Sequence, residues 1–126
     1  MRRSDQRRDA VFANYQRDVT GRPLEDLLGS ETRLLTRELA EGVDEHREEL
    51  DDVIAAHAKG WTVDRIAPLD MNVMRAALYE MEFMDTPAEV AINEAVELAK
   101  EYCGAEAPGV VNGILGAVVR ERGATA

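Results

Sequence analysis

Apolar residues recur every three or four positions along almost the whole chain, and this spacing constrains the fold more than any other feature of the sequence. Such a repeat places one apolar stripe on each of a series of helices. No segment alternates apolar and polar residues with the period of two that half-buried strands require. The pattern therefore predicts an all-α protein.

The stripes predict about seven helices joined by short links. Candidate capping residues precede several of them: Ser4, Ser30, Asp44, Asp70 and Thr86, with Glu89 three residues after Thr86. Pro87 suits a first helical turn, although it could instead hold the chain extended and delay the start to about Ala91. Trp61 is expected to fill a gap between helices. The expected ranges are about 5–19, 23–29, 31–42, 45–58, 71–84, 87–103 and 109–121.

The length of 126 residues fits one ordinary domain with a buried core. Seven short-linked helices make either one bundle or two small bundles that share an interface. No apolar run approaches the ~20 residues that span a bilayer, and no signal-peptide core follows the start. Because Cys103 is the single cysteine, we expect a cytoplasmic protein without disulfides and without membrane contact.

Charge is distributed unevenly along the chain. Residues 1–23 hold six arginines and three aspartates, a net charge of +3, so residues 24–126 carry −13. Four of these arginines lie within residues 2–8, which we call the arginine tip. Cations at a helix start oppose the helix dipole and cost up to about 1 kcal/mol each, so helix stability does not explain them. Charge alone leaves two alternatives, a solvated chain end and a local site for a polyanion.

Residue patterns typical of catalysis are missing from the sequence. It has no P-loop, no dinucleotide-binding glycine turn and no G-x-S-x-G elbow. His46 and His57 are eleven residues apart, not the four that place two metal ligands on one helix face, and no motif supplies a base for Cys103. We therefore expect no catalytic residue, no metal and no cofactor. A binding function is what remains.

A second candidate surface is "PGVVNG", residues 108–113, where two glycines bracket the expected start of the last helix. Backbone N–H groups exposed at a helix start suit phosphate oxygens, and glycine lets a ligand backbone come close. Asn112 could add a hydrogen bond to a base edge. The alternative is that the glycines only permit tight helix packing.

The chain resembles the NusB family of bacterial transcription antitermination factors. The resemblance covers essentially the whole chain, although residues 24–58 match mainly by helical pattern. It rests on five ordered blocks: "RRDAVFANYQ", "GWTVDRIAPLD", "RAALYEMEF", "VAINEAVELAKEY" and "VVNGILGAVV".

The resemblance implies a NusB-like fold of two small packed helical subdomains, about 1–43 and about 44–126, within a single RNA-binding domain 1–126. Family members are not enzymes. They bind the boxA element of nascent RNA together with NusE, a small-subunit ribosomal protein, and as part of the RNA polymerase antitermination complex promote read-through in ribosomal RNA operons. Two alternatives are a protein-only helical adaptor and a fragment of an RNA cytosine methyltransferase, whose RNA-binding domain is similar.

The resemblance also implies site residues. In the family, an arginine-rich first helix and the loop before the last helix make much of the RNA surface. By position this surface takes in Arg3, Arg7, Tyr15, Asn112 and Gly113, and the charge of the tip adds Arg2 and Arg8. The partner surface takes in Asp70, with Arg75 and Glu80 as its neighbours. We expect Arg7→Glu to damage RNA binding with little loss of helicity, and the tip to work beside "PGVVNG".

Three residues depart from the family pattern. Val110 stands where the family often has Phe, so base stacking at that point is lost. Asp5 interrupts the arginine tip. Asn14 stands where many relatives are apolar, and if it faces the core it lowers stability unless it is hydrogen-bonded.

Overall fold

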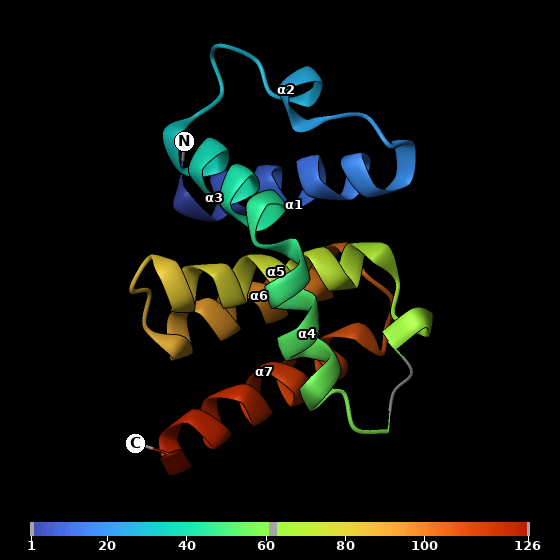
Figure 1. Cartoon of the computed structure of the whole chain (residues 1–126), viewed down its shortest axis with the longest axis vertical. Coiled ribbons are helices and arrows are strands. Elements are labelled where there is room, and N and C mark those ends of the chain that lie inside the picture. Colours follow the sequence, from blue (N-terminus) through green and yellow to red (C-terminus); the bar gives the residue numbers. More distant parts are fainter. Residues whose placement is uncertain (1, 61–62, 126) are drawn as a thin grey trace.

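The computed structural model describes residues 2–60 and 63–125, and this part of the chain is built from helices (Figure 1). The elements are α1 (Arg3–Thr20), α2 (Leu24–Leu27), α3 (Leu34–Glu45), α4 (Arg47–His57), a 3₁₀ turn (Val63–Arg65), α5 (Pro68–Phe83), α6 (Ala88–Tyr102) and α7 (Ala107–Thr125). The prediction of an all-α fold with seven helices is confirmed, since the described ranges contain no strand. Trp61, expected to fill a gap, lies outside the described residues.

The residues expected to cap the helices do not cap them. The structure begins α1 after Arg2, α5 after Ala67 and α6 after Pro87, without a side-chain capping hydrogen bond. The alternative start of α6 at about Ala91 is also wrong, because the helix begins at Ala88. The physical reason is that several candidate caps bond to other helices instead. The prediction of a capping role was wrong for Ser4, Ser30, Asp44, Asp70 and Thr86.

Helix α5 is the centre of the fold. It packs against α1, α3, α4, α6 and α7, and every residue from Met71 to Leu78 is buried. A helix covered on all sides must be apolar or internally paired nearly all round, because no face of it can be solvated. The polar residues of α5 must therefore find partners inside the protein.

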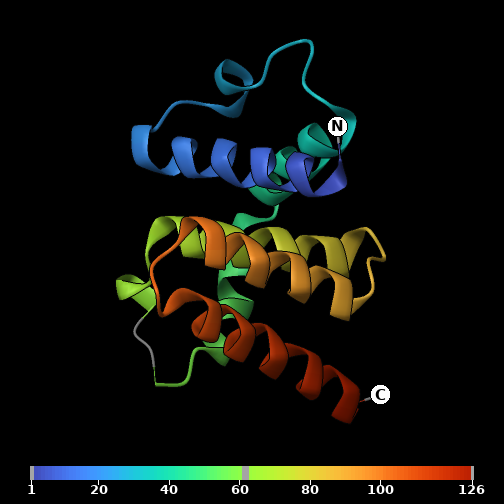
Figure 2. The same ribbon diagram turned by 180° about the vertical axis from the view of Figure 1, so that it is seen from behind.

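Helix α1 lies against both α3 and α5. Figures 1 and 2 show α1, α2 and α3 together above α5 and α6, with α7 below them. A continuous core of buried side chains runs from Val11 of α1 through Leu39 of α3 and Leu78 of α5 to Ile114 of α7. The division at about residue 43 into two subdomains stays a prediction. Within the described residues, no helix is both long and apolar enough to cross a bilayer.

Asn14 faces the core, where only 2% of the residue is exposed. Its side-chain Nδ2 donates to the carbonyl oxygen of Ala40 in α3, at 3.1 Å. Because this bond satisfies the buried amide, the departure from the family pattern becomes a contact between two helices.

Candidate nucleic-acid interface

The first turn of α1 presents two exposed arginines. Arg2 is the N-cap residue, and its side chain lies 3.4 Å from the Asp5 carboxylate in an exposed pair. Arg3 is exposed, and its side chain has no ion-pair or hydrogen-bond partner among the residues that the structure describes. An exposed pair of this kind contributes little stability and is easily replaced by another anion. Arg2 and Arg3 are thus the parts of the arginine tip that can meet a phosphate.

Arg7 is placed differently, because its guanidinium is buried between three helices. Nε lies 2.8 Å from Glu80 Oε2 and Nη2 lies 3.0 Å from Glu80 Oε1 on α5. Nη1 is 3.5 Å from Glu94 on α6, and the residue is only 7% exposed. The hydrogen bonds with Glu80 raise the pKa of Arg7 against the effect of burial. These contacts do not support a role for Arg7 in RNA binding, which stays a prediction.

The signal for this burial was present in the sequence. Arg7 stands three, four and seven residues before Ala10, Val11 and Asn14, so all four share the face of α1 that meets the core. The charge of Arg7 predicts an exposed side chain like those of Arg2 and Arg3, whereas its position on the helix predicts a buried one. The carboxylates are themselves supported by hydroxyl donors: Thr86 bonds to Glu80 and Ser4 to Glu94, each at 3.0 Å.

Arg8 is half-exposed and held by neighbours. It donates to the Asp9 carboxylate at 3.0 and 3.1 Å and lies 3.4 Å from Asp5. Hydrogen bonds with Asp9 and then with the Tyr102 hydroxyl raise its pKa. The four arginines of the tip therefore fall into three environments, and only Arg2 and Arg3 point a largely solvated cation outward.

The block "PGVVNG" lies entirely within α7 and makes up most of its first two turns. The helix begins at Ala107, so Asn112 is exposed on the second turn and Gly113 is half-buried. The backbone N–H groups of Asn112 and Gly113 lie inside the helix, whereas Pro108, Gly109 and Val110 lie in its first turn. A phosphate contact at this helix start stays a prediction. Asn112 keeps an exposed amide side chain that can reach a ligand.

The tip and the start of α7 also lie at opposite ends of the molecule. In both Figure 1 and Figure 2, α7 starts at the side where α1 ends and runs back toward the side where α1 begins. The expectation that the tip works beside "PGVVNG" is therefore not supported. Tyr15 is half-buried on α1, two turns beyond Arg8. An RNA that touched both Arg3 and Asn112 would have to span much of the protein.

Two of the three predicted partner residues are internal. Arg75 of α5 binds Asp51 of α4 through Nε at 2.6 Å and Nη2 at 2.9 Å, and binds Asp18 of α1 through Nη1 at 2.8 Å. Burial lowers the pKa of Arg75, but Asp51 and Asp18 raise it more. Glu80, 2% exposed, is the buried partner of Arg7. Neither side chain is presented to another protein.

Asp70 is the predicted partner residue that reaches a surface cavity. It is half-buried in the first turn of α5 and lines a cavity of about 340 Å³. Val110, where the resemblance leads us to expect Phe, lines the same cavity. The remaining lining residues are Gly60, Arg65, Ile66, Ala67, Glu106 and Ala107.

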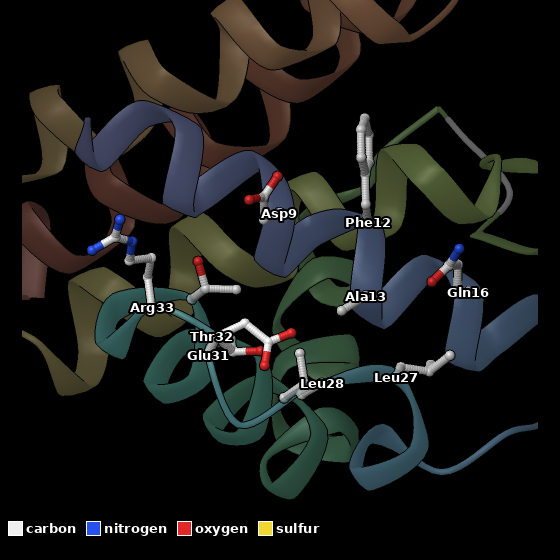
Figure 3. A pocket seen from close by; sticks show the side chains of 10 residues that line it. Asp9, Phe12, Ala13, Gln16, Leu27, Leu28, Glu31, Thr32 and Arg33 are labelled. Carbon is white, nitrogen blue, oxygen red and sulfur yellow. The ribbon is translucent and has the colours of Figure 1, made fainter. Parts of the chain in front are cut away.

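A second cavity, of about 300 Å³, lies between α1 and the segment before α3 (Figure 3). Figure 3 shows Phe12 and Asp9 on α1, with Leu27, Leu28 and Arg33 on the other wall. Asp9 and Glu31 offset the charge of Arg33 here. No sequence pattern predicted this cavity, because its two walls are distant in the chain. Its mixed charge does not favour a polyanion.

Cys103 and the histidines have structural surroundings. Burial, followed by a hydrogen bond with Asp70, raises the pKa of the Cys103 thiol to about 12, which disfavours the thiolate that a nucleophile needs. His46 Nδ1 lies 2.9 Å from Glu49, and His57 Nε2 lies 2.5 Å from Glu121. In the described ranges no three His, Cys, Asp or Glu side chains are grouped to hold a metal.

Asp18 makes the stability of the fold depend on pH. Burial raises the pKa of Asp18, but hydrogen bonds from Asn72 and Arg47 and the charges of Arg47 and Arg75 lower it further, to below its ordinary 3.8. A carboxylate whose pKa is lower in the folded than in the unfolded protein stabilises the fold above about pH 3.8, and this stability is lost as the pH falls through the folded pKa.

We expect the free energy of unfolding, measured by urea titration, to fall in that acid range less steeply for Asp18→Asn than for the parent. The exposed Asp26→Asn variant should follow the parent, and equal slopes for all three proteins would contradict this.

The fold and these residues define a helical binding protein, with exposed arginines at one end and a paired core. The model for the NusB family matches residues 4–120. The transcription antitermination protein NusB of Rubrobacter xylanophilus is 44% identical to this chain, over 91% of this chain and 88% of that protein. NusB of T. maritima superposes with a TM-score of 0.84 at 30% identity, over 96% of this chain and 92% of that one. The chain therefore belongs to the NusB family.

A further solved structure, described as antitermination factors NusB and NusE in complex with dsRNA, shares the fold. Its TM-score is 0.82 at 23% identity, over 94% of this chain and 96% of that one. The names of the curated relatives confirm the prediction of a non-enzymatic role in transcription antitermination.

Proposed function

We propose that this chain acts in the cytoplasm as a transcription antitermination factor, binding boxA RNA together with NusE and promoting read-through in ribosomal RNA operons. The observation that carries the proposal is membership of the NusB family over residues 4–120. The solved relative that holds NusB, NusE and dsRNA supports the choice of partners. The exposed Arg2 and Arg3 supply the cations that such an RNA needs.

The arrangement of charge predicts how RNA is bound. Arginines at the start of α1 give counterion release and phosphate contacts, which carry affinity but little sequence preference. The rest of the protein is acidic, and two of the four tip arginines are paired with carboxylates of the protein itself, Arg7 with the buried Glu80 and Arg8 with the partly exposed Asp9. We therefore expect weak binding to RNA alone. Selectivity comes from groups that read base edges, such as Asn112, and from NusE.

A four-way titration tests the proposal. BoxA RNA and a scrambled RNA of equal length are each titrated with the protein, with and without NusE, and the dissociation constants are measured by fluorescence anisotropy. The proposal expects boxA with NusE to bind most tightly and the scrambled RNA alone most weakly. Equal affinity in all four cases would overturn it.

Replacing Arg3 by alanine should weaken RNA binding without changing sequence preference. Loss of one phosphate contact lowers the affinity for boxA and scrambled RNA alike and reduces the salt slope of binding by about one. The measurement is the affinity of the NusE complex for both RNAs over a range of salt. Arg120→Ala, which removes an exposed cation from α7, is the matched control. An unchanged salt slope for Arg3→Ala would show that Arg3 does not touch phosphate.

The two alternative functions make different predictions. A protein-only adaptor would bind NusE but show no salt-dependent RNA affinity in the same titration. The antitermination role is favoured over the methyltransferase alternative because the curated relative that is 44% identical is named an antitermination protein.

A further inference from the structure

Three ring systems form a partly exposed stack at the end of α5. His46, between α3 and α4, stacks on Phe83 with ring centroids 4.3 Å apart and planes 25° apart. Tyr79 also stacks on Phe83, with ring centroids 4.9 Å apart and planes 29° apart. Phe83 is 45% exposed. An aromatic ring left this open at a surface is a candidate contact for a ligand or partner.

The stack is held in place by the backbone of α3. A Cβ on the buried Gly42 would lie 2.1 Å from Cζ of Tyr79, so the Tyr79 ring rests directly against the glycine. Glycine at this position is what allows the close approach. The rings are therefore positioned before any partner arrives, which lowers the entropy cost of binding.

A small cavity of about 70 Å³ opens beside Phe83. Its apolar lining includes Leu50 and Leu78, and its polar lining includes Glu49 and Glu82. Arg122 of α7 also lines it and contacts the carboxylate of Glu82. The guanidinium of Arg122 thus shows that the rim of this cavity can bind an arginine side chain.

The surroundings of the stack are acidic. The pKa of Tyr79 is raised by burial and then by the negative charges of Glu38 and Glu45. Glu49 Oε1 lies 2.9 Å from His46 Nδ1. Such a surface repels phosphate, whereas the exposed part of the Phe83 ring and the carboxylates together attract a cation.

We propose that this aromatic–acidic patch, formed by His46, Tyr79, Phe83, Glu49 and Glu82, is a docking surface for an arginine-rich segment of a partner protein. An arginine side chain stacks its planar guanidinium on the ring of Phe83, lays its aliphatic stem over the cavity and donates to the carboxylates. The patch is separate from Asp70, because Phe83 lies thirteen positions further along α5, which corresponds to about 20 Å of helix. The proposal goes beyond the RNA and NusE contacts and does not depend on them.

The test uses the full ¹⁵N-labelled chain and a fluorescent peptide of Arg-Gly repeats. We expect amide shifts around residues 46, 79 and 83. Phe83→Leu keeps the apolar bulk but removes the ring, and should weaken binding of the peptide about two- to fivefold. Glu49→Gln should weaken it by up to about fivefold. The matched controls are Val90→Ala, which trims another exposed apolar side chain, and Glu48→Gln, which removes an exposed charge that does not line the cavity.

Three outcomes would overturn the proposal. Shifts spread evenly over the acidic helices would show non-specific attraction to a chain of net charge −10. Equal peptide affinity for Phe83→Leu and the parent would show that the ring takes no part. Shifts at the same amides on addition of a single-stranded oligonucleotide would identify a nucleic-acid site. Unchanged boxA affinity of Phe83→Leu separates this surface from the proposed RNA function.

Discussion

Replacing Arg7 by glutamate is expected to destabilise the protein by about 3–5 kcal/mol, because the substitution removes one partner of a buried ion pair and leaves the other charge uncompensated. The new carboxylate would also face Glu80 and Glu94. Since a domain of this size is stable by only about 5–15 kcal/mol, a large part of the population should unfold on mild heating. The measurement is urea denaturation followed by circular dichroism. This replaces the expectation that Arg7→Glu would leave helicity nearly unchanged.

Two variants separate the structural role of Arg7 from a role in RNA binding. Arg3→Glu makes the same charge change at the exposed first residue of α1 and should alter stability by less than about 0.5 kcal/mol. The double variant Arg7→Met with Glu80→Leu replaces the buried pair by apolar side chains and should recover most of the stability. If Arg7→Glu were as stable as the parent and lost only RNA affinity, the buried pair would not be holding α1 in place.

Replacing Arg75 by alanine should be comparably severe, with a loss of about 3–5 kcal/mol. The guanidinium joins α5 to Asp51 of α4 and Asp18 of α1, so its removal leaves two carboxylates facing the same gap. Urea denaturation again gives the free energy of unfolding. A lowered NusE affinity in this variant would then follow from unfolding, because Arg75 is buried within the protein.

The geometry of the Arg75 contacts supplies a second test. Arg75→Lys keeps the charge but cannot donate two parallel hydrogen bonds to Asp51, so it should recover only part of the lost stability. Lys100→Ala removes an exposed pair with Glu97 and should have almost no effect. A variant Arg75→Ala that folds normally and fails only to bind NusE would contradict the internal role.

The fold was largely predictable because it depends on local patterns. The three-to-four residue spacing of apolar side chains identified seven helices, and the structure places all seven close to the expected ranges. The helix starts were less predictable. Pro68 is the first residue of α5 and Pro87 is the N-cap of α6. Ser4 of α1 donates to Glu94 of α6, and Thr86, in the loop after α5, donates back to Glu80 of α5. Capping rules see only the local chain, whereas the side chain bonds to whichever partner lies nearest in space.

The site was predictable only in part, for the same physical reason. The sequence by itself determined the helical class, the acidic body and the presence of an arginine-rich start. Only the tertiary structure decided which arginines are free, because α5 and α6 bring Glu80 and Glu94 against Arg7 and leave Arg3 in solvent. The same packing turned Arg75 and Glu80 inward and brought His46, between α3 and α4, against the Tyr79 and Phe83 rings of α5. Charge and helical period can be read along one segment, but the partner of a buried charge is supplied by another helix.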